Sequence, residues 1–125
     1  MNENFDTLSI DEKISVALET GNWMVRVSQN GSAYGGFKWN GIGEWTIAVD
    51  WNDSPVCGGG LHGSALEGWG YFSRYSQDAR FEFCATEGER VVIDDDKIKV
   101  RKAMILAVGN DALAAICDIV YHLWS

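Results

Sequence analysis

The chain is poor in positive charge, in proline and in paired cysteines. It has 10 Lys and Arg against 18 Asp and Glu, one Pro, and three Cys at wide spacings without a CxxC pair. Scarce Lys and Arg disfavour binding to nucleic acid or to an anionic membrane, because contact with phosphates needs cations spread over a surface. The odd number of Cys and the lack of a secretory leader predict reduced thiols and a cytoplasmic protein. No apolar run approaches the roughly 18 residues that cross a bilayer.

The composition predicts one folded unit. The chain is 46% hydrophobic and contains six Trp, five Phe, four Tyr and 14 Gly, which supply a core and many turns. A chain of 125 residues can bury most of its apolar surface without disulfides or a metal. We therefore expect a single, monomeric domain over residues 1–125 with no cofactor and no metal. Residues 1–7 are expected to be frayed.

Helix signals stand near both ends of the chain. Ser9 and Glu12 form the S-x-x-E pattern in which each side chain satisfies a free backbone N–H. Gly21 stands where a left-handed residue would end that helix. Asn110 can cap a second helix near the C-terminus. The second helix would carry one apolar stripe, formed by Leu113, Ile116, Cys117, Val120 and Trp124.

Between these helices apolar and polar residues alternate, which is typical of strands with one buried face. The clearest case places Trp45, Ile47 and Val49 on the buried face and leaves Glu44 and Asp50 in water. Strands that alternate in this way normally belong to antiparallel sheets.

The other strand signals describe an antiparallel meander. Glu87-Gly88 would turn the chain within one hairpin, and three successive Asp, residues 94–96, would turn it again. The sequence thus predicts an α+β fold in which a mostly antiparallel sheet of five to seven strands is joined by an N-terminal and a C-terminal helix. Further strands are expected near residues 23–27, 37–39, 81–84 and 91–93, in the alternating basic segment 97–102, and in the apolar run 103–108.

A glycine-rich segment, residues 57–64, is the most distinctive local signal, and we expect it to be irregular. It holds Cys57, His62 and Ser64 within eight residues, so one hypothesis is a small enzyme with His62 as the base. It lacks the lysine and glycine spacing of phosphate loops and the ligand spacing of zinc sites. The alternative that we favour is a structural loop pinned by a local hydrogen bond of His62. The residues of that loop are Gly59, Gly60, His62 and Gly63.

Acidic side chains are spread over the N-terminal helix and the strands that follow it. One interpretation is a surface that takes the place of a polyanion on a basic partner, and the other is simple solubility. Duplex DNA carries about one charge per 1.7 Å, which is denser than the helix alone. The basic side chains of residues 97–102 are expected to neutralise nearby acids. The partner-binding residues that we expect are Asp6, Asp11, Glu12, Glu19, Glu44, Asp50 and Asp53.

Three short motifs occur together in the second half of the chain: GGLHG at residues 59–63, VVI at 91–93 and KIKVRKA at 97–103. This combination resembles a group of small proteins and domains of phages and bacterial mobile elements. In size and charge the chain resembles anti-CRISPR proteins that act on type I systems. The resemblance implies an inhibitor in the host bacterial cytoplasm, and it carries no catalytic residues onto this chain.

These expectations describe a non-enzymatic inhibitor that occupies the nucleic-acid groove of a CRISPR surveillance complex and blocks target DNA. Its partner would be a basic nucleic-acid-binding protein of the host, without direct contact to nucleic acid or membrane. The small enzyme remains one alternative. Another is a partner bound through exposed aromatic residues, and salt distinguishes that one, because charge steering fades above about 0.1 M while apolar contact does not.

Overall fold

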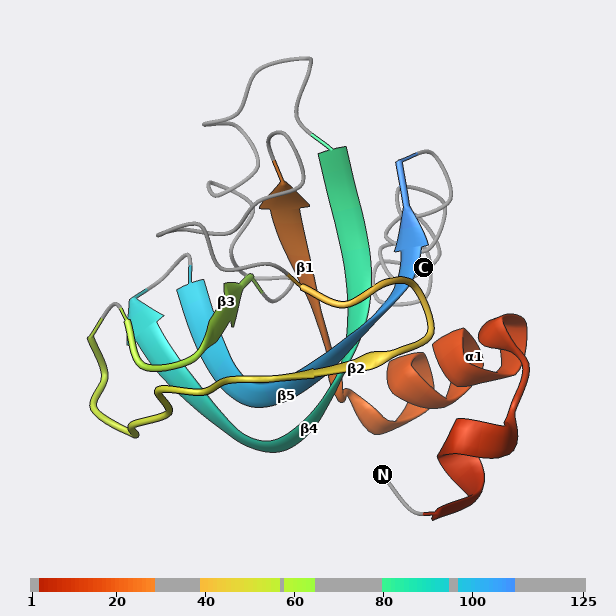
Figure 1. Ribbon diagram of the computed structural model, residues 1–125, viewed down its shortest axis with the longest axis horizontal. Coiled ribbons are helices and arrows are strands. Elements are labelled where there is room, and N and C mark those ends of the chain that lie inside the picture. Colours follow the sequence, from red (N-terminus) through yellow and green to blue (C-terminus); the bar gives the residue numbers. More distant parts are fainter. Residues whose placement is uncertain (1–2, 29–38, 57, 65–79, 95–96, 110–125) are drawn as a thin grey trace, which may run out of the picture.

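The computed structural model describes residues 3–28, 39–56, 58–64, 80–94 and 97–109 (Figure 1). Within them the fold is α+β with a five-stranded antiparallel sheet, which confirms the predicted class. The C-terminal helix expected after Asn110 lies outside the described residues. The elements are η1 (Glu3–Thr7), α1 (Ile10–Thr20), β1 (Trp23–Ser28), β2 (Trp45–Ile47), β3 (Leu61–Gly63), β4 (Arg80–Asp94) and β5 (Lys97–Val108).

Local signals set both ends of α1. The Ser9 side chain accepts the Glu12 N–H at 3.2 Å, and the Glu12 carboxylate accepts the Ser9 N–H at 3.0 Å, so the predicted capping box is present. Gly21 follows the helix with φ +74°, in the left-handed region that the prediction required.

The N-terminal segment differs from the frayed end that we expected. Residues 3–7 of this segment form the 3-10 helix η1. Residues 1–2 lie outside the described residues. Phe5 is 2% exposed, and its ring centre lies 5.7 Å from that of Trp45. The burial of Phe5 in the core and its contact with Trp45 help to anchor a segment whose other residues are mostly polar.

Two long strands form the centre of the sheet. The strand order is β1-β4-β5-β2, and β3 pairs with β5 beside this path. Figure 1 shows β4 and β5 as one curved hairpin, and Asp94 pairs with Lys97 where the chain reverses. The turn expected at Glu87-Gly88 is wrong, because β4 continues through it. Gly88 has φ +86° and the register shifts between Glu87 and Arg90, so the glycine bends a strand instead of ending it.

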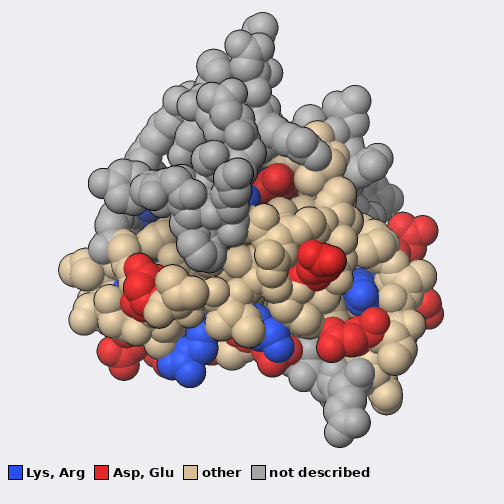
Figure 2. Space-filling view, in the orientation of Figure 1, with Lys and Arg blue, Asp and Glu red and all other residues tan. Residues whose placement is uncertain are grey.

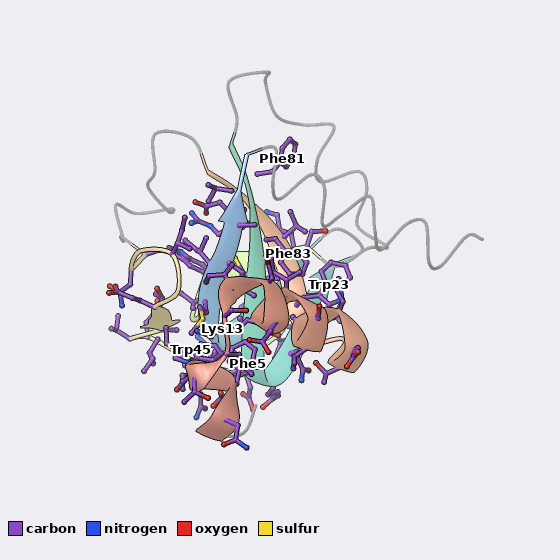
Figure 3. All side chains as sticks on the ribbon, turned by 90° about the vertical axis from the view of Figure 1, so that its right-hand side faces the viewer. Phe5, Lys13, Trp23, Trp45, Phe81 and Phe83 are labelled. Atoms are coloured by element: carbon purple, nitrogen blue, oxygen red, sulfur yellow. The ribbon has the colours of Figure 1, made fainter. Side chains whose placement is uncertain are left out.

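The sheet is covered on both faces. Helix α1 packs against β4 and β5 over a core that contains Phe83 and Met104, and Figure 3 shows the helix in front of these strands. The opposite face buries a second cluster that contains Met24 and Val100. β1 is therefore buried on both sides, where the sequence predicted one wet face.

The predicted faces of segment 45–49 are reversed after Trp45, which is partly buried against the core as predicted. Ile47 and Val49 are 57% and 85% exposed, whereas Thr46 and Ala48 are 3% and 9% exposed. Thr46 lies opposite Ala103 in the ladder with β5, so these two small residues share the covered face. The Thr46 hydroxyl accepts the Asn40 N–H at 2.9 Å, which satisfies the buried polar group. The predicted exposure of Glu44 and Asp50 is correct.

Candidate functional site

Three carboxylates lie on the outer face of α1. At 3.6 residues per turn, Asp11, Glu12 and Glu19 fall within an arc of about 100°, and all are exposed. The opposite side of the helix buries Ala17 completely against the sheet. Helix α1 therefore presents acid to solvent along a single stripe.

Two further carboxylates extend this stripe from neighbouring segments. Asp6 accepts a hydrogen bond from Trp45 Nε1 at 2.7 Å, which ties η1 to the start of β2. Glu44 directly precedes Trp45, and the adjacent Gly43 is close enough to α1 that an added Cβ would lie 3.6 Å from Ile10 Cδ1. We call this set the acidic end of the molecule: Asp6, Asp11, Glu12, Glu19 and Glu44, all exposed.

Lys13 is the only Lys or Arg between residues 3 and 25, and it is withdrawn from solvent. It is 6% exposed, and its Nζ lies 5.7 Å from the centre of the Phe5 ring. Figure 3 shows both side chains at the end of α1 that faces η1. Lys102 approaches the Trp45 ring from β5 at 4.6 Å, but it forms an ion pair with Glu87 at 3.4 Å. Within η1 and α1 the exposed charges are therefore all negative.

The remaining two expected partner-binding residues, Asp50 and Asp53, lie elsewhere. They follow β2 in the segment at the left of Figure 1, whereas α1 lies at the right. Figure 2 shows acidic side chains at several separate places on this face, with Lys and Arg between them. The structure thus brings five of the seven carboxylates together and leaves Asp50 and Asp53 apart.

A second cluster surrounds Lys99, which is fully buried. Its Nζ donates to Asn52 Oδ1 and to the Gly58 carbonyl, both at 3.0 Å, and lies 5.7 Å from the centre of the Trp51 ring. Among the described residues no carboxylate forms an ion pair with it. Within the described residues, neutral oxygens and an aromatic ring therefore stand where we expected an acid beside Lys99. Lys102, from the same basic segment, does pair with an acid, Glu87.

His62 belongs to the same cluster. It lies opposite Lys99 in the β3–β5 ladder, and its Nε2 accepts the Gly58 N–H at 3.1 Å. Burial lowers the pKa of His62, and Lys99 and Lys97 lower it further, against an opposing effect of Asp50. The imidazole is therefore neutral at pH 7, as an acceptor of a backbone N–H requires. We call these residues the Lys99 cluster: Trp51, Asn52, Gly58, His62 and Lys99.

The glycines of the GGLHG motif fit close contacts in and beside this cluster. Gly59 has φ +67°, a left-handed conformation that favours glycine. An added Cβ at Gly60 would lie 3.1 Å from the Trp51 ring and 3.2 Å from Lys99 Cδ. At Gly63 it would lie 2.6 Å from Met24 Sδ. The expected irregular segment is in part regular, since residues 61–63 form β3.

The enzyme hypothesis finds little support in this geometry. Ser64 is fully buried, and its N–H and C=O both bond to Val25. His62 Nε2, which would have to act as the base, already accepts the Gly58 N–H. Cys57 lies outside the described residues. No group of three or more His, Cys, Asp or Glu in the described segments is arranged to hold a metal ion.

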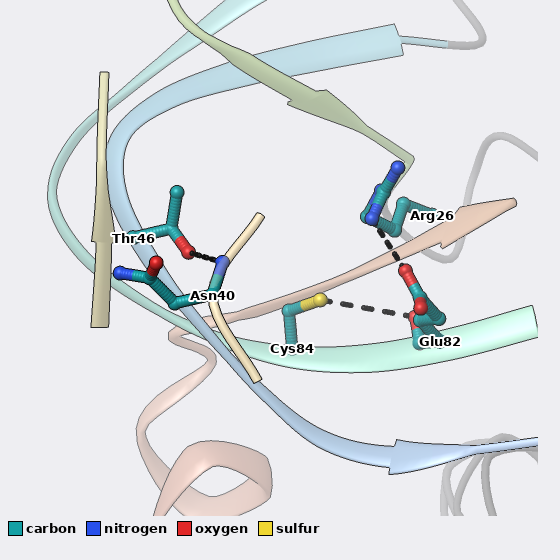
Figure 4. Close-up of polar contacts among 5 residues, drawn as sticks. All are labelled: Arg26, Asn40, Thr46, Glu82 and Cys84. Carbon is teal, nitrogen blue, oxygen red and sulfur yellow. Dashed lines mark hydrogen bonds and ion pairs between the residues drawn. The ribbon is translucent and has the colours of Figure 1, made fainter. Parts of the chain in front are cut away.

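A buried ion pair joins β1 and β4 (Figure 4). Arg26 Nη1 is 2.5 Å from Glu82 Oε1, and its guanidinium lies 4.3 Å from the centre of the Trp39 ring. The Sγ of Cys84 points at the Glu82 carbonyl, 3.9 Å away, and burial raises the pKa of this thiol far above its ordinary value. Cys84 is therefore an inert core residue. Sequence reasoning missed this ion pair. The signal that could have indicated it is the position of Glu82 between two phenylalanines, Phe81 and Phe83.

No helix within the described residues has the length and apolar character needed to cross a membrane. Comparison with known proteins gives no further guide, since no family model, curated protein or solved structure matches the chain. The functional argument therefore rests on the acidic end and the Lys99 cluster.

Proposed function

We propose that this chain is a non-catalytic binding protein whose acidic end docks on a basic surface of a partner protein. The observation that carries the proposal is the set of five exposed carboxylates on η1, α1 and the turn before β2, with Lys13 buried beneath them. Because the exposed charges of η1 and α1 are all negative, a cationic groove can approach α1 without like-charge repulsion.

The partner that we propose is a nucleic-acid-binding protein of a bacterial host, and specifically a type I CRISPR surveillance complex. The support for this identity is the resemblance of the GGLHG, VVI and KIKVRKA motifs to phage and mobile-element proteins, together with the size and charge of the chain. In this proposal the bound protein occupies the groove that target DNA would enter.

The charge density sets how such docking would work. Asp11 to Glu19 spans about 12 Å of helix at ~1.5 Å per residue, a length over which duplex DNA carries roughly seven charges. Helix α1 exposes three carboxylates over the same length. The fit of the helix in a groove must therefore supply most of the affinity, while charge speeds association at low salt.

Two triple variants with equal changes in charge test the proposal. The first carries Asp11→Asn, Glu19→Lys and Glu44→Lys, and the second carries Asp50→Lys, Asp53→Lys and Glu89→Gln. Glu12 is left in place because it caps α1, and Asp6 because it holds Trp45. Thermal unfolding of both variants checks that each remains folded.

The assay measures binding of a labelled target duplex by a purified type I surveillance complex, with increasing amounts of each protein. We expect wild-type protein and the second variant to block binding, and the first variant to need at least about tenfold more protein, because exposed ion pairs contribute only about 0–1 kcal/mol each and several are lost together. Equal loss in both variants, or no inhibition by wild-type protein, would contradict the proposal.

A further inference from the structure

The segment that follows β2 is held to the sheet by the Lys99 cluster. We call it the 51–60 loop, of which residues 51–56 and 58–60 are described. Both backbone groups of Gly58 are bound: His62 Nε2 accepts its N–H at 3.1 Å, and Lys99 Nζ donates to its C=O at 3.0 Å. One residue of the loop is thus fixed by two side chains from two paired strands.

Asn52 provides the second point of attachment. Its side-chain Oδ1 accepts from Lys99 Nζ at 3.0 Å and from the Ser54 N–H at 3.2 Å, and its own N–H donates to the Gly59 carbonyl at 2.9 Å. Between these two points the loop is exposed, with Val56 55% exposed. The loop therefore depends on a few polar contacts, since few of its side chains enter the core.

Two of the three charged groups around His62 lower its pKa, and the third raises it. Lys99 and Lys97 lie on the paired strand β5, and Asp50 precedes the loop; β3 itself carries no other charged residue. A proton on Nε2 would turn the acceptor of the Gly58 N–H into a donor. It would also place a second positive charge opposite Lys99, which has no ion-pair partner among the described residues.

We propose that His62 is a proton-sensitive clamp for the 51–60 loop: the neutral imidazole holds Gly58 on β3 and β5, and its protonation releases the loop. Release frees the Gly58 carbonyl and Asn52 from Lys99 and opens this buried ammonium to water. It also moves the exposed part of the loop, which carries Asp53 and Val56. This property is independent of the acidic end, so each proposal can fail without the other.

The test is nuclear magnetic resonance of the intact chain between pH 7.5 and 4.5. The His62 ring signals report its protonation, and hydrogen exchange of the Gly58 amide, corrected for the intrinsic effect of pH, reports opening of the loop. The variants are His62→Gln, whose amide oxygen can accept the Gly58 N–H but does not titrate, and His122→Gln, which replaces the only other histidine in the chain.

We expect the corrected exchange rate of Gly58 to rise at least about tenfold on acidification, the scale of one net hydrogen bond, in wild-type protein and in His122→Gln. The rate in His62→Gln should change much less. In Lys99→Met the His62 ring should titrate at a higher pH, because an opposing charge is gone. The proposal is overturned if His62 does not titrate between pH 7.5 and 4.5. It is also overturned if the exchange rate of Gly58 rises as much in His62→Gln as in wild-type protein, or if Lys99→Met does not raise the pH at which His62 titrates.

Discussion

The close approach of Asn52 to Gly59 allows a test of the Lys99 cluster that does not involve titration. An added Cβ at Gly59, where φ is +67°, would lie 2.0 Å from Asn52 Nδ2 and 2.5 Å from its Cγ. The Asn52 side chain cannot move away without leaving Lys99 Nζ, which donates to its Oδ1. Gly88 is the matched control, because its φ is +86° and nothing lies within 4 Å of an added Cβ.

The expected magnitudes follow from these contacts. Gly88→Ala places a side chain in the left-handed region and should lower the free energy of unfolding by about 1–2 kcal/mol. Gly59→Ala carries the same strain and in addition displaces Asn52 from a buried cation, and a hydrogen bond to a charged group contributes about 1.5–3 kcal/mol. The total for Gly59→Ala should therefore be roughly 2.5–5 kcal/mol.

Urea unfolding of wild-type protein and both variants measures these differences. A third comparison makes Gly59→Ala in the Asn52→Ala background, where the clash and the Lys99 contact are both absent. In that background Gly59→Ala should destabilise by no more than Gly88→Ala does. If the two alanine variants of the wild-type chain are equally stable, Asn52 yields freely, and the contact with Lys99 does not hold the loop.

Two further predictions concern buried charges. Arg26→Met removes the Arg26 guanidinium from the buried Glu82 carboxylate, and breaking a buried ion pair from one side should destabilise by about 3–5 kcal/mol. The double variant with Glu82→Met should recover most of this loss in urea unfolding, and a further loss would argue against the pair. For His62, the lowered pKa in the folded state means that the unfolded chain binds more protons below about pH 6.5. The contribution of His62 to the free energy of unfolding is therefore constant above about pH 6.5 and falls below it. Wild-type protein should lose stability relative to His62→Gln between about pH 6.5 and 5. A difference in unfolding free energy that does not change with pH would contradict this prediction.

Local signals in the sequence were sufficient for α1 and for the reversal of the chain between Asp94 and Lys97, because each depends on residues within four positions of one another. The Ser9–Glu12 capping box and Gly21 are of this kind. Gly88 was misleading because the same left-handed glycine serves in a turn and in a bulge. Only the pairing of β4 with β5 along its whole length distinguishes the two.

The sequence predicts which acidic residues could form the acidic end, but it predicts only part of their arrangement in space. The helical period is sufficient to place Asp11, Glu12 and Glu19 on one face of α1, and the structure shows all three exposed. The addition of Asp6 depends on a hydrogen bond to Trp45, 39 residues away. The burial of Lys13 depends on Phe5, in a segment expected to be frayed. Both follow from the anchoring of η1, for which the sequence has no local signal.

The reversed faces of β2 and the burial of Lys99 have a common origin in the register between β2 and β5. Thr46 lies opposite Ala103, and the Ala48 N–H donates to the Arg101 carbonyl. This register turns Ile47 and Val49 outward. It also directs the chain beyond Ala48 along β5. There the centre of the Trp51 ring lies 5.3 Å from the Arg101 guanidinium and 5.7 Å from Lys99 Nζ. Asn52 and Gly58 then reach Lys99 from 47 and 41 residues away. Two-residue alternation specifies which residues share a face and leaves open which face is covered. The exposure of Ile47 and Val49 and the burial of Lys99 therefore could not be read from the alternation alone.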